Sequence, residues 1–298
     1  MTGMQLTPIF CLVDDFCKNI LPEFNKRLIG DGRQLRVRKD CLSESEIMSL
    51  SQIKILIWFN LSGFKCFKHF YLSYNPVLKS NFPKIPCYER FVILQKKSFI
   101  WMNLFLRFLT EKTAQKTDVY YIDSTFLEVC KNQRIYRHKT FKGLAARGVS
   151  SCGWFYGFKL HLITNNLGEI VSFAITKGNI SDQNMTAELA KKLSGFLFGD
   201  KGYLSAKTAA ELLKKGLHLI TKVRQNMKPK PISEANKFLL KKRGIIETVF
   251  GQLKDFRHLV HTKYRSKINY FTNVLSALLA YMLNPDKPKI CLNRVEFA

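Results

Sequence analysis

Apolar residues in the first third of the chain recur at helical spacing. Ser43 and Glu46 form a capping box, with the glutamate three positions after the serine, and residues 47–61 then carry an apolar residue every three or four positions. A second, aromatic-rich helix is expected after Gly63, and a third over 88–109. We therefore expect residues 1–112 to form an all-helical region.

The pattern changes to strands near residue 118. Apolar segments bounded by turns predict a meander of VYYID, FLEVC, FYGFKLHLITN and EIVSFAITKG, with a loop from Lys131 to Trp154 before the third segment. Helices and short strands then alternate, ending in a long helix over about 232–256 and a final one over about 268–283. This order predicts an α/β region at 113–298, in which helices pack on a mixed β-sheet.

The charge balance is strongly basic. The 298 residues contain 48 Lys and Arg against 22 Asp and Glu, a net charge of +26. Such an excess favours a polyanionic partner, most simply nucleic acid, with ribosomal RNA and anionic membrane surfaces as alternatives. Residues 63–107 hold eight Lys or Arg and one acid, Glu89, which is typical of a small DNA-binding helical module or of a solvated basic face.

Other sequence features predict a cytoplasmic protein with no membrane partner. Asp14 and Asp15 interrupt the first apolar stretch, and the apolar runs at 47–61 and 271–283 are short for a membrane span. No two of the eight cysteines have the spacing of a zinc knuckle or a redox pair.

Three carboxylates fall at comparable places in the predicted elements. Asp123 is expected to end the first strand, Asp200 ends FLFGD, and Glu247 lies in the long helix. Neighbouring parallel strands bring their carboxyl ends together, so the two aspartates can converge. At about 100° per residue, Arg243 and Lys254 share one edge of the helix with Glu247. Read locally, Asp123 before Ser-Thr can also cap a turn, and Arg243 with Glu247 can be an ordinary i,i+4 ion pair.

Clustered carboxylates stay ionised when cations compensate them. The hard ions Mg²⁺ or Mn²⁺ suit these oxygens, and two of them would activate water at a phosphodiester. A phosphatase of the haloacid-dehalogenase class is disfavoured because Thr125 stands where that class needs a second aspartate. Glu128 and Asp182 are alternative acids for the cluster.

The segment Lys131–Lys159 contains seven Lys or Arg and no acid. We interpret it as a DNA-facing loop, against a merely solvated one, in which Arg134, Arg137 and Lys142 contact phosphates. Lys201, directly after Asp200, is a further candidate for a phosphate contact.

The segments YYIDST, FGDKGYLS and KKRGIIETVFGQLK, with the block from Gly153 to Asp182, resemble the DDE transposases of bacterial insertion sequences. The resemblance covers nearly the whole chain. It implies an RNase-H-like core, a catalytic and metal-binding triad of Asp123, Asp200 and Glu247, and two divalent metals. Arg243 and Lys254 match the family's signature around the last acid, and the resemblance implies that they hold the DNA backbone or a terminal base. Leu240 stands at the signature's tyrosine position.

The function implied by this resemblance is DNA transposition. The protein would bind the ends of its insertion sequence, hydrolyse a phosphodiester there and join the 3′-hydroxyl to target DNA, as a homo-oligomer on DNA. A metal-dependent nuclease of the same fold without strand transfer, and a catalytically inactive DNA-binding derivative, are the alternatives.

Overall fold

The computed structural model divides the chain into two compact units. The first comprises residues 1–108, 256–258 and 266–283, and the second comprises 109–255, 259–265 and 284–298. The residues that the structure describes are 7–16, 18, 44–112, 117–151, 153–222, 232–257, 259 and 264–291.

The first unit is helical, as the sequence predicts. Besides residues 7–16, its described helices are α2 (Glu44–Ser62), α3 (Phe67–Ser73), α4 (Asn75–Asn81), α5 (Tyr88–Leu94), a 3₁₀ turn (Gln95–Lys97), α6 (Ser98–Lys112, which runs into the second unit) and α11 (Lys267–Met282). A helix over 75–81 was not expected from a proline-marked stretch, but Pro76 lies in its first turn, where a missing N–H costs nothing.

Helix α11 is the central helix of this unit. It is buried almost all round between Asn269 and Tyr281, and α2 packs on it through Asn60, whose Nδ2 donates to Ser276 Oγ at 3.0 Å. Sequence analysis placed α11 in the 113–298 region, whereas by contacts it belongs with the N-terminal helices. The functional division at residue 112 stays a prediction.

The second unit is built on one six-stranded mixed sheet. Its strands are β1 (Val119–Cys130), β2 (Ala146–Ser150), β3 (Gly153–Asn165), β4 (Ile170–Lys177), β5 (Gly195–Gly199) and β6 (Leu217–Thr221). The order is β2-β3-β1-β5-β6, and β4 follows β2 along the same edge of β3. β1 is antiparallel to β3 and parallel to β5, which is parallel to β6. The predicted α/β fold, a mixed sheet flanked by helices and preceded by a helical region, is confirmed.

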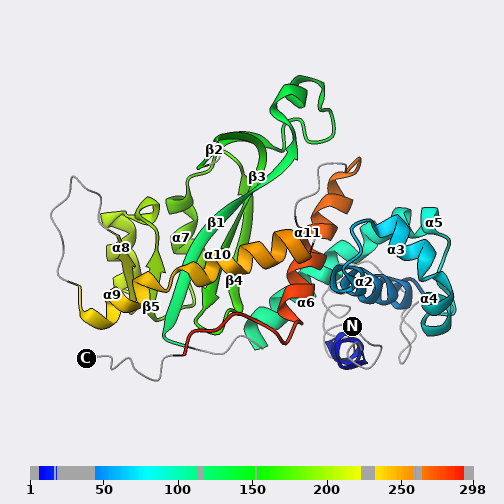
Figure 1. Cartoon of the computed structure of the whole chain (residues 1–298), viewed down its shortest axis with the longest axis horizontal. Helices are drawn as coiled ribbons and strands as arrows, with labels where there is room; N and C mark the ends of the chain where they lie inside the picture. The colour runs from blue at the N-terminus through cyan, green and yellow to red at the C-terminus, as the bar shows by residue number, and fades with distance from the viewer. Residues whose placement is uncertain are drawn as a thin grey trace, which may run out of the picture. The chain divides into compact units, whose positions relative to one another are not determined.

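Helices cover the middle of this sheet. A core around Tyr120, Ile122 and Leu197 packs against residues of α7 (Asp182–Leu189) and α8 (Ala206–Leu213). Helix α10 (Gly244–Gly251) contacts β1 and, in Figure 1, runs across it after α9 (Glu234–Lys241). The first four residues of β1 are buried because helices cover both faces of a central strand.

Two element boundaries differ from the sequence expectation. β1 does not end at Asp123, because its antiparallel pairing with β3 continues to Cys130. The single long helix predicted over 232–256 is instead α9, α10 and a π-helical turn (Gln252–Phe256). The helix breaks at Lys242 and Arg243, because the next residue, Gly244, is a poor helix former. In the described part of the chain, no helix is both long and apolar enough to cross a membrane.

Candidate active site

The register between β1 and β5 brings Asp123 and Asp200 together. The parallel pairing runs from Val119–Phe196 to Tyr121–Phe198, and two residues further on Asp123 stands level with Asp200. β1 continues beside β3 at that point, whereas β5 ends at Gly199 and the chain turns into a 3₁₀ helix (Lys201–Tyr203). The two predicted acids therefore meet where the parallel pairing stops, although only one of them ends a strand.

Asp123 is a largely buried carboxylate with mixed surroundings. The pKa of Asp123 is raised from 3.8 to about 6, with burial as the largest cause; the charge of Asp200 also raises this pKa, whereas the Ser124 N–H and the Arg243 guanidinium lower it. The Ser124 N–H donates to Asp123 Oδ1 at 2.8 Å. This carboxylate thus stays ionised at neutral pH because nearby donors oppose the desolvation.

Arg243 joins the first and third predicted acids. Its Nη1 donates to Asp123 Oδ2 and its Nη2 to Glu247 Oε1, each at 3.0 Å. The Arg243 side chain is 16% exposed and that of Glu247 is 61% exposed. The predicted i,i+4 pair does form, and the same guanidinium also reaches β1. A residue expected to contact DNA is here held by two carboxylates.

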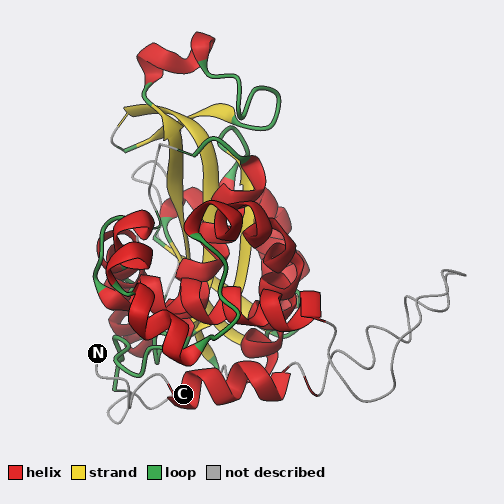
Figure 2. Cartoon of the chain, turned by 90° about the vertical axis from the view of Figure 1, so that its right-hand side faces the viewer, coloured by secondary structure: helices red, strands yellow, loops and turns green. Residues whose placement is uncertain are grey.

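The other candidate cations lie around this cluster. Lys254, in the π-helical turn, places its Nζ 4.6 Å from the ring centroid of Phe126 on β1. Lys201 is exposed in the turn after Asp200. Arg134, Arg137 and Lys142 are exposed in the segment between β1 and β2, which extends beyond the ends of the sheet strands (Figure 2). That segment is a 3₁₀ helix, η3 (Asn132–Arg137), and a loop before β2, rather than one long loop.

A second polar cluster, which the sequence did not predict, lies beside Asp123. Asp182 opens α7 and accepts hydrogen bonds from Ser124 Oγ at 2.8 Å and Lys159 Nζ at 3.2 Å. His161 is fully buried, and its Nδ1 lies 3.7 Å from Asp182 Oδ1. Burial lowers the pKa of the His161 imidazole to about 4, so this ring is neutral. Asp182, considered above only as an alternative acid, is held by a lysine and a serine.

The next residue on α7 holds the turn after Asp200. Gln183 Nε2 donates to the carbonyl oxygens of Gly202 and Leu204, both at 3.0 Å. Between them, Tyr203 is buried, and its pKa is raised by burial and then by the charges of Asp123 and Asp182. The first two residues of α7 therefore contact both β1, at Ser124, and the turn that follows Asp200. Glu128, the other alternative acid, lies five residues beyond Asp123 near a bulge in β1.

The donor chemistry suits a divalent metal, but the described residues do not form a three-ligand group. Carboxylate oxygens are the ligands that Mg²⁺ and Mn²⁺ prefer, and Asp123 and Asp200 are close enough to interact electrostatically. No cluster of three His, Cys, Asp or Glu side chains suited to a metal is found among those residues. Arg243 is the cation that compensates Asp123 and Glu247 here.

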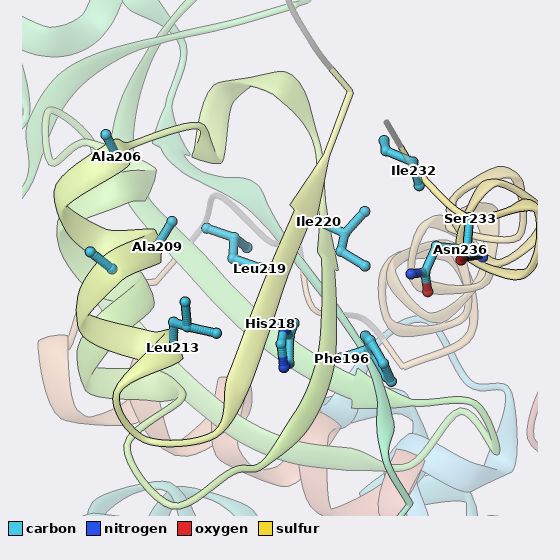
Figure 3. Close-up of a pocket in the computed structure, with 11 residues that line it drawn as sticks. Phe196, Ala206, Ala209, Leu213, His218, Leu219, Ile220, Ile232, Ser233 and Asn236 are labelled. Atoms are coloured by element: carbon cyan, nitrogen blue, oxygen red, sulfur yellow. Dashed lines mark hydrogen bonds between the residues drawn. The ribbon is translucent and has the colours of Figure 1, made fainter. Parts of the chain in front are cut away.

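A cavity of about 470 Å³ lies elsewhere in this unit, beside β6 (Figure 3). Its eleven lining residues come from β5, α8, β6 and the segment that starts α9, and His218 is the one titratable side chain among them. Because this lining has no carboxylate, the cavity does not belong to the acidic cluster.

Comparison with known proteins identifies the family. Residues 113–267 match the family described as "Transposase DDE domain". No curated protein matches the sequence. Among solved structures, the piggyBac transposase synaptic complex with hairpin DNA aligns with 86% of this chain and 70% of that one, at 12% identity and a TM-score of 0.46. The family match spans more than half of the chain, which therefore belongs to the transposase DDE domain family. Its members generally use divalent metal ions.

Proposed function

We propose that this transposase binds the ends of its own insertion sequence, hydrolyses a phosphodiester at each end and joins the resulting 3′-hydroxyl to target DNA. The single observation that carries the proposal is the meeting of Asp123 and Asp200 in register, with Glu247 tied to Asp123 through Arg243. Family membership supports the reaction class, and the net charge of +26 supports DNA as the partner.

Asp123, Asp200 and Glu247 are proposed to hold two Mg²⁺ or Mn²⁺ ions. The bound ions would supply Lewis-acid stabilisation of the scissile phosphate and a water of lowered pKa. Asp123 is suited to this role because Arg243 and the Ser124 N–H keep it ionised in a buried place. Arg243, whose guanidinium joins Asp123 to Glu247, is proposed to contact the DNA backbone or a terminal base beside these acids.

The proposed DNA contacts lie around this site. Lys254 and Lys201 are proposed to hold phosphates near the scissile bond, and Arg134, Arg137 and Lys142 to hold the backbone further away. The helical region at 1–112 is proposed to recognise the element end, and the protein to act as a homo-oligomer on DNA. Reversing the charge of Arg134 and Arg137 together should reduce the slope of log affinity against log salt by about two.

Substitution of the acids tests the catalytic assignment. Asp123→Asn and Glu247→Gln should abolish cleavage of DNA carrying the element's terminal repeats in Mg²⁺, while gel-shift binding to those ends is kept. Glu128→Gln, a carboxylate loss on the same strand as Asp123, is the matched control and should cut normally. Cleavage by either triad variant would overturn the triad. Cleavage by wild-type protein without joining of the 3′-hydroxyl to a target plasmid would identify a nuclease instead.

A further inference from the structure

Two of the most exposed large side chains lie on one arm of the second unit. We define the arm as residues 131–154, which comprise η3, the loop after it, β2 and the first residues of β3. Tyr136 is 90% exposed and Trp154 is 67% exposed. Figure 1 shows the arm extending past the sheet above β2 and β3. The backbone contacts proposed above use the cations of this arm and leave its two exposed rings without a role.

The arm has a small core of its own. His138 stacks on Phe141 with ring centroids 5.6 Å apart and an interplanar angle of 4°, and Phe141 packs edge-on against Phe158 of β3. Phe141 is 1% exposed, and Tyr156 Oη donates to its carbonyl at 3.3 Å. Lys177 Nζ on β4 also donates to the carbonyl of Gly143. A surface built on these contacts is pre-organised, so that ligand binding orders little chain.

The exposed rings are themselves supported. The Arg147 guanidinium lies 5.7 Å from the ring centroid of Tyr136 and its Nη2 donates to the Tyr136 hydroxyl at 3.5 Å, while the ring stays open to solvent. Val149, two positions along β2 from Arg147, pairs with Trp154 and is also exposed. Asn132 Nδ2 donates to the Trp154 carbonyl at 2.6 Å. Because residues two apart share a face of a strand, Arg147, Val149 and Trp154 form one exposed strip, with Tyr136 over its first member.

The charge around this strip selects the kind of partner. Arg134, Arg137, Lys139 and Lys142 are exposed on the same arm as Arg147, and residues 131–159 contain no acid. Burying so many unpaired cations in an apolar protein interface would be costly. A nucleic acid offers phosphates for the cations and flat π-faces for the rings.

We propose that the Tyr136–Trp154 strip binds unpaired nucleotides of the DNA substrate by stacking their bases on the two rings. The inference rests on the proposed function, which supplies DNA as the substrate, and it adds that the arm recognises single-stranded or frayed DNA rather than intact duplex. Paired bases are already stacked on one another, whereas an unpaired base exposes both π-faces. The arm cations hold the backbone of either form.

The test compares two DNA probes on the full chain in EDTA, where no cleavage occurs. Fluorescence anisotropy measures binding of a labelled single-stranded oligonucleotide and of the duplex of the same sequence. Tyr136→Ala and Trp154→Ala should each weaken single-strand binding about tenfold, within the range for base–aromatic stacking, and change duplex binding less than twofold. Tyr136→Phe and Trp154→Phe keep a ring and should restore binding. Phe238→Ala, which removes another exposed aromatic ring, on α9, is the matched control and should change neither.

Equal losses on both probes, or no loss on either, would overturn the proposal. The phenylalanine variants answer the possibility that the alanine variants misfold, because they test the ring with little change of shape. The Asp123→Asn protein should show the same preference as wild type. If that variant still cut DNA, the catalytic assignment would fail while the stacking result stood unaffected.

Discussion

Asp123→Asn should make the metal-free protein more stable at neutral pH. The folded protein raises the pKa of Asp123 from 3.8 to about 6, with burial as the largest cause. Above both values the ionised carboxylate favours the unfolded chain, and one pKa unit corresponds to about 1.4 kcal/mol. The shift of about two units therefore corresponds to about 3 kcal/mol of stability lost at pH 7.5. Asparagine resembles the protonated acid and does not incur this loss.

The sign of the pH dependence follows from the raised pKa. Between pH 4 and 6 the folded state binds more protons than the unfolded state at this group, so wild-type stability falls as pH rises through this window. The Asn variant lacks this titrating carboxyl group. The difference in unfolding free energy between the Asn variant and wild type should therefore grow from near zero at pH 4 to about 3 kcal/mol above pH 7.

Urea unfolding in EDTA at a series of pH values measures this difference. Glu128→Gln, whose carboxylate lies on the same strand, controls for the loss of one acid. Adding Mg²⁺ should then stabilise wild type more than the Asn variant, because ligand that binds the folded state shifts the midpoint. The reasoning would be refuted if the Asn variant were no more stable than wild type at pH 7.5. It would also be refuted if the variant exceeded wild type in stability by as much at pH 4 as at pH 7.5.

Three further variants test the surroundings of the acids. Gly157→Ala should unfold the second unit or destabilise it by more than about 3 kcal/mol, because a Cβ there would overlap the Leu127 carbonyl oxygen. Thermal unfolding followed by circular dichroism measures this loss, and an unchanged melting temperature would contradict the packing. Gln183→Ala should raise the Mg²⁺ concentration for half-maximal cleavage, because the turn after Asp200 loses two hydrogen bonds; an unchanged metal titration would show that this contact does not position Asp200. Arg243→Gln should raise the pKa of Asp123 above about 6. The acid limb of the cleavage–pH profile should then shift to higher pH, and an unshifted limb would contradict the ion pair between Arg243 and Asp123.

The sequence predicted the elements better than their ends. Alternation and turn residues identified every strand except β2, which lies in a segment read as a loop because its ARGVS residues lack a strong apolar pattern. Asp123 was expected to end β1, because four β-prone residues run directly into that aspartate. Pairing with β3, which depends on residues far away in the chain, carries the strand on to Cys130.

The sequence offered three candidate acids, whose assignment stays a prediction, but it did not indicate the residues that contact them. Asp200 and Glu247 follow from order and motif, and helical arithmetic placed Arg243 beside Glu247. Nothing local indicated that the same guanidinium reaches Asp123, 120 positions earlier in the chain. Asp182 and Gln183 read as an ordinary helix start after a serine, and their contacts with Ser124 and Gly202 depend on tertiary packing.

The register between β1 and β5 also bears on how this fold can change in length. Asp123 and Asp200 are level because of backbone pairing between Val119–Tyr121 and Phe196–Phe198, and none of these residues lies in the arm. An insertion or deletion in the arm at 131–154 therefore leaves this spacing unchanged. Grafting a different hairpin between Cys130 and Phe155 would therefore change the DNA contacts proposed for the arm and keep the backbone pairing that sets Asp123 level with Asp200.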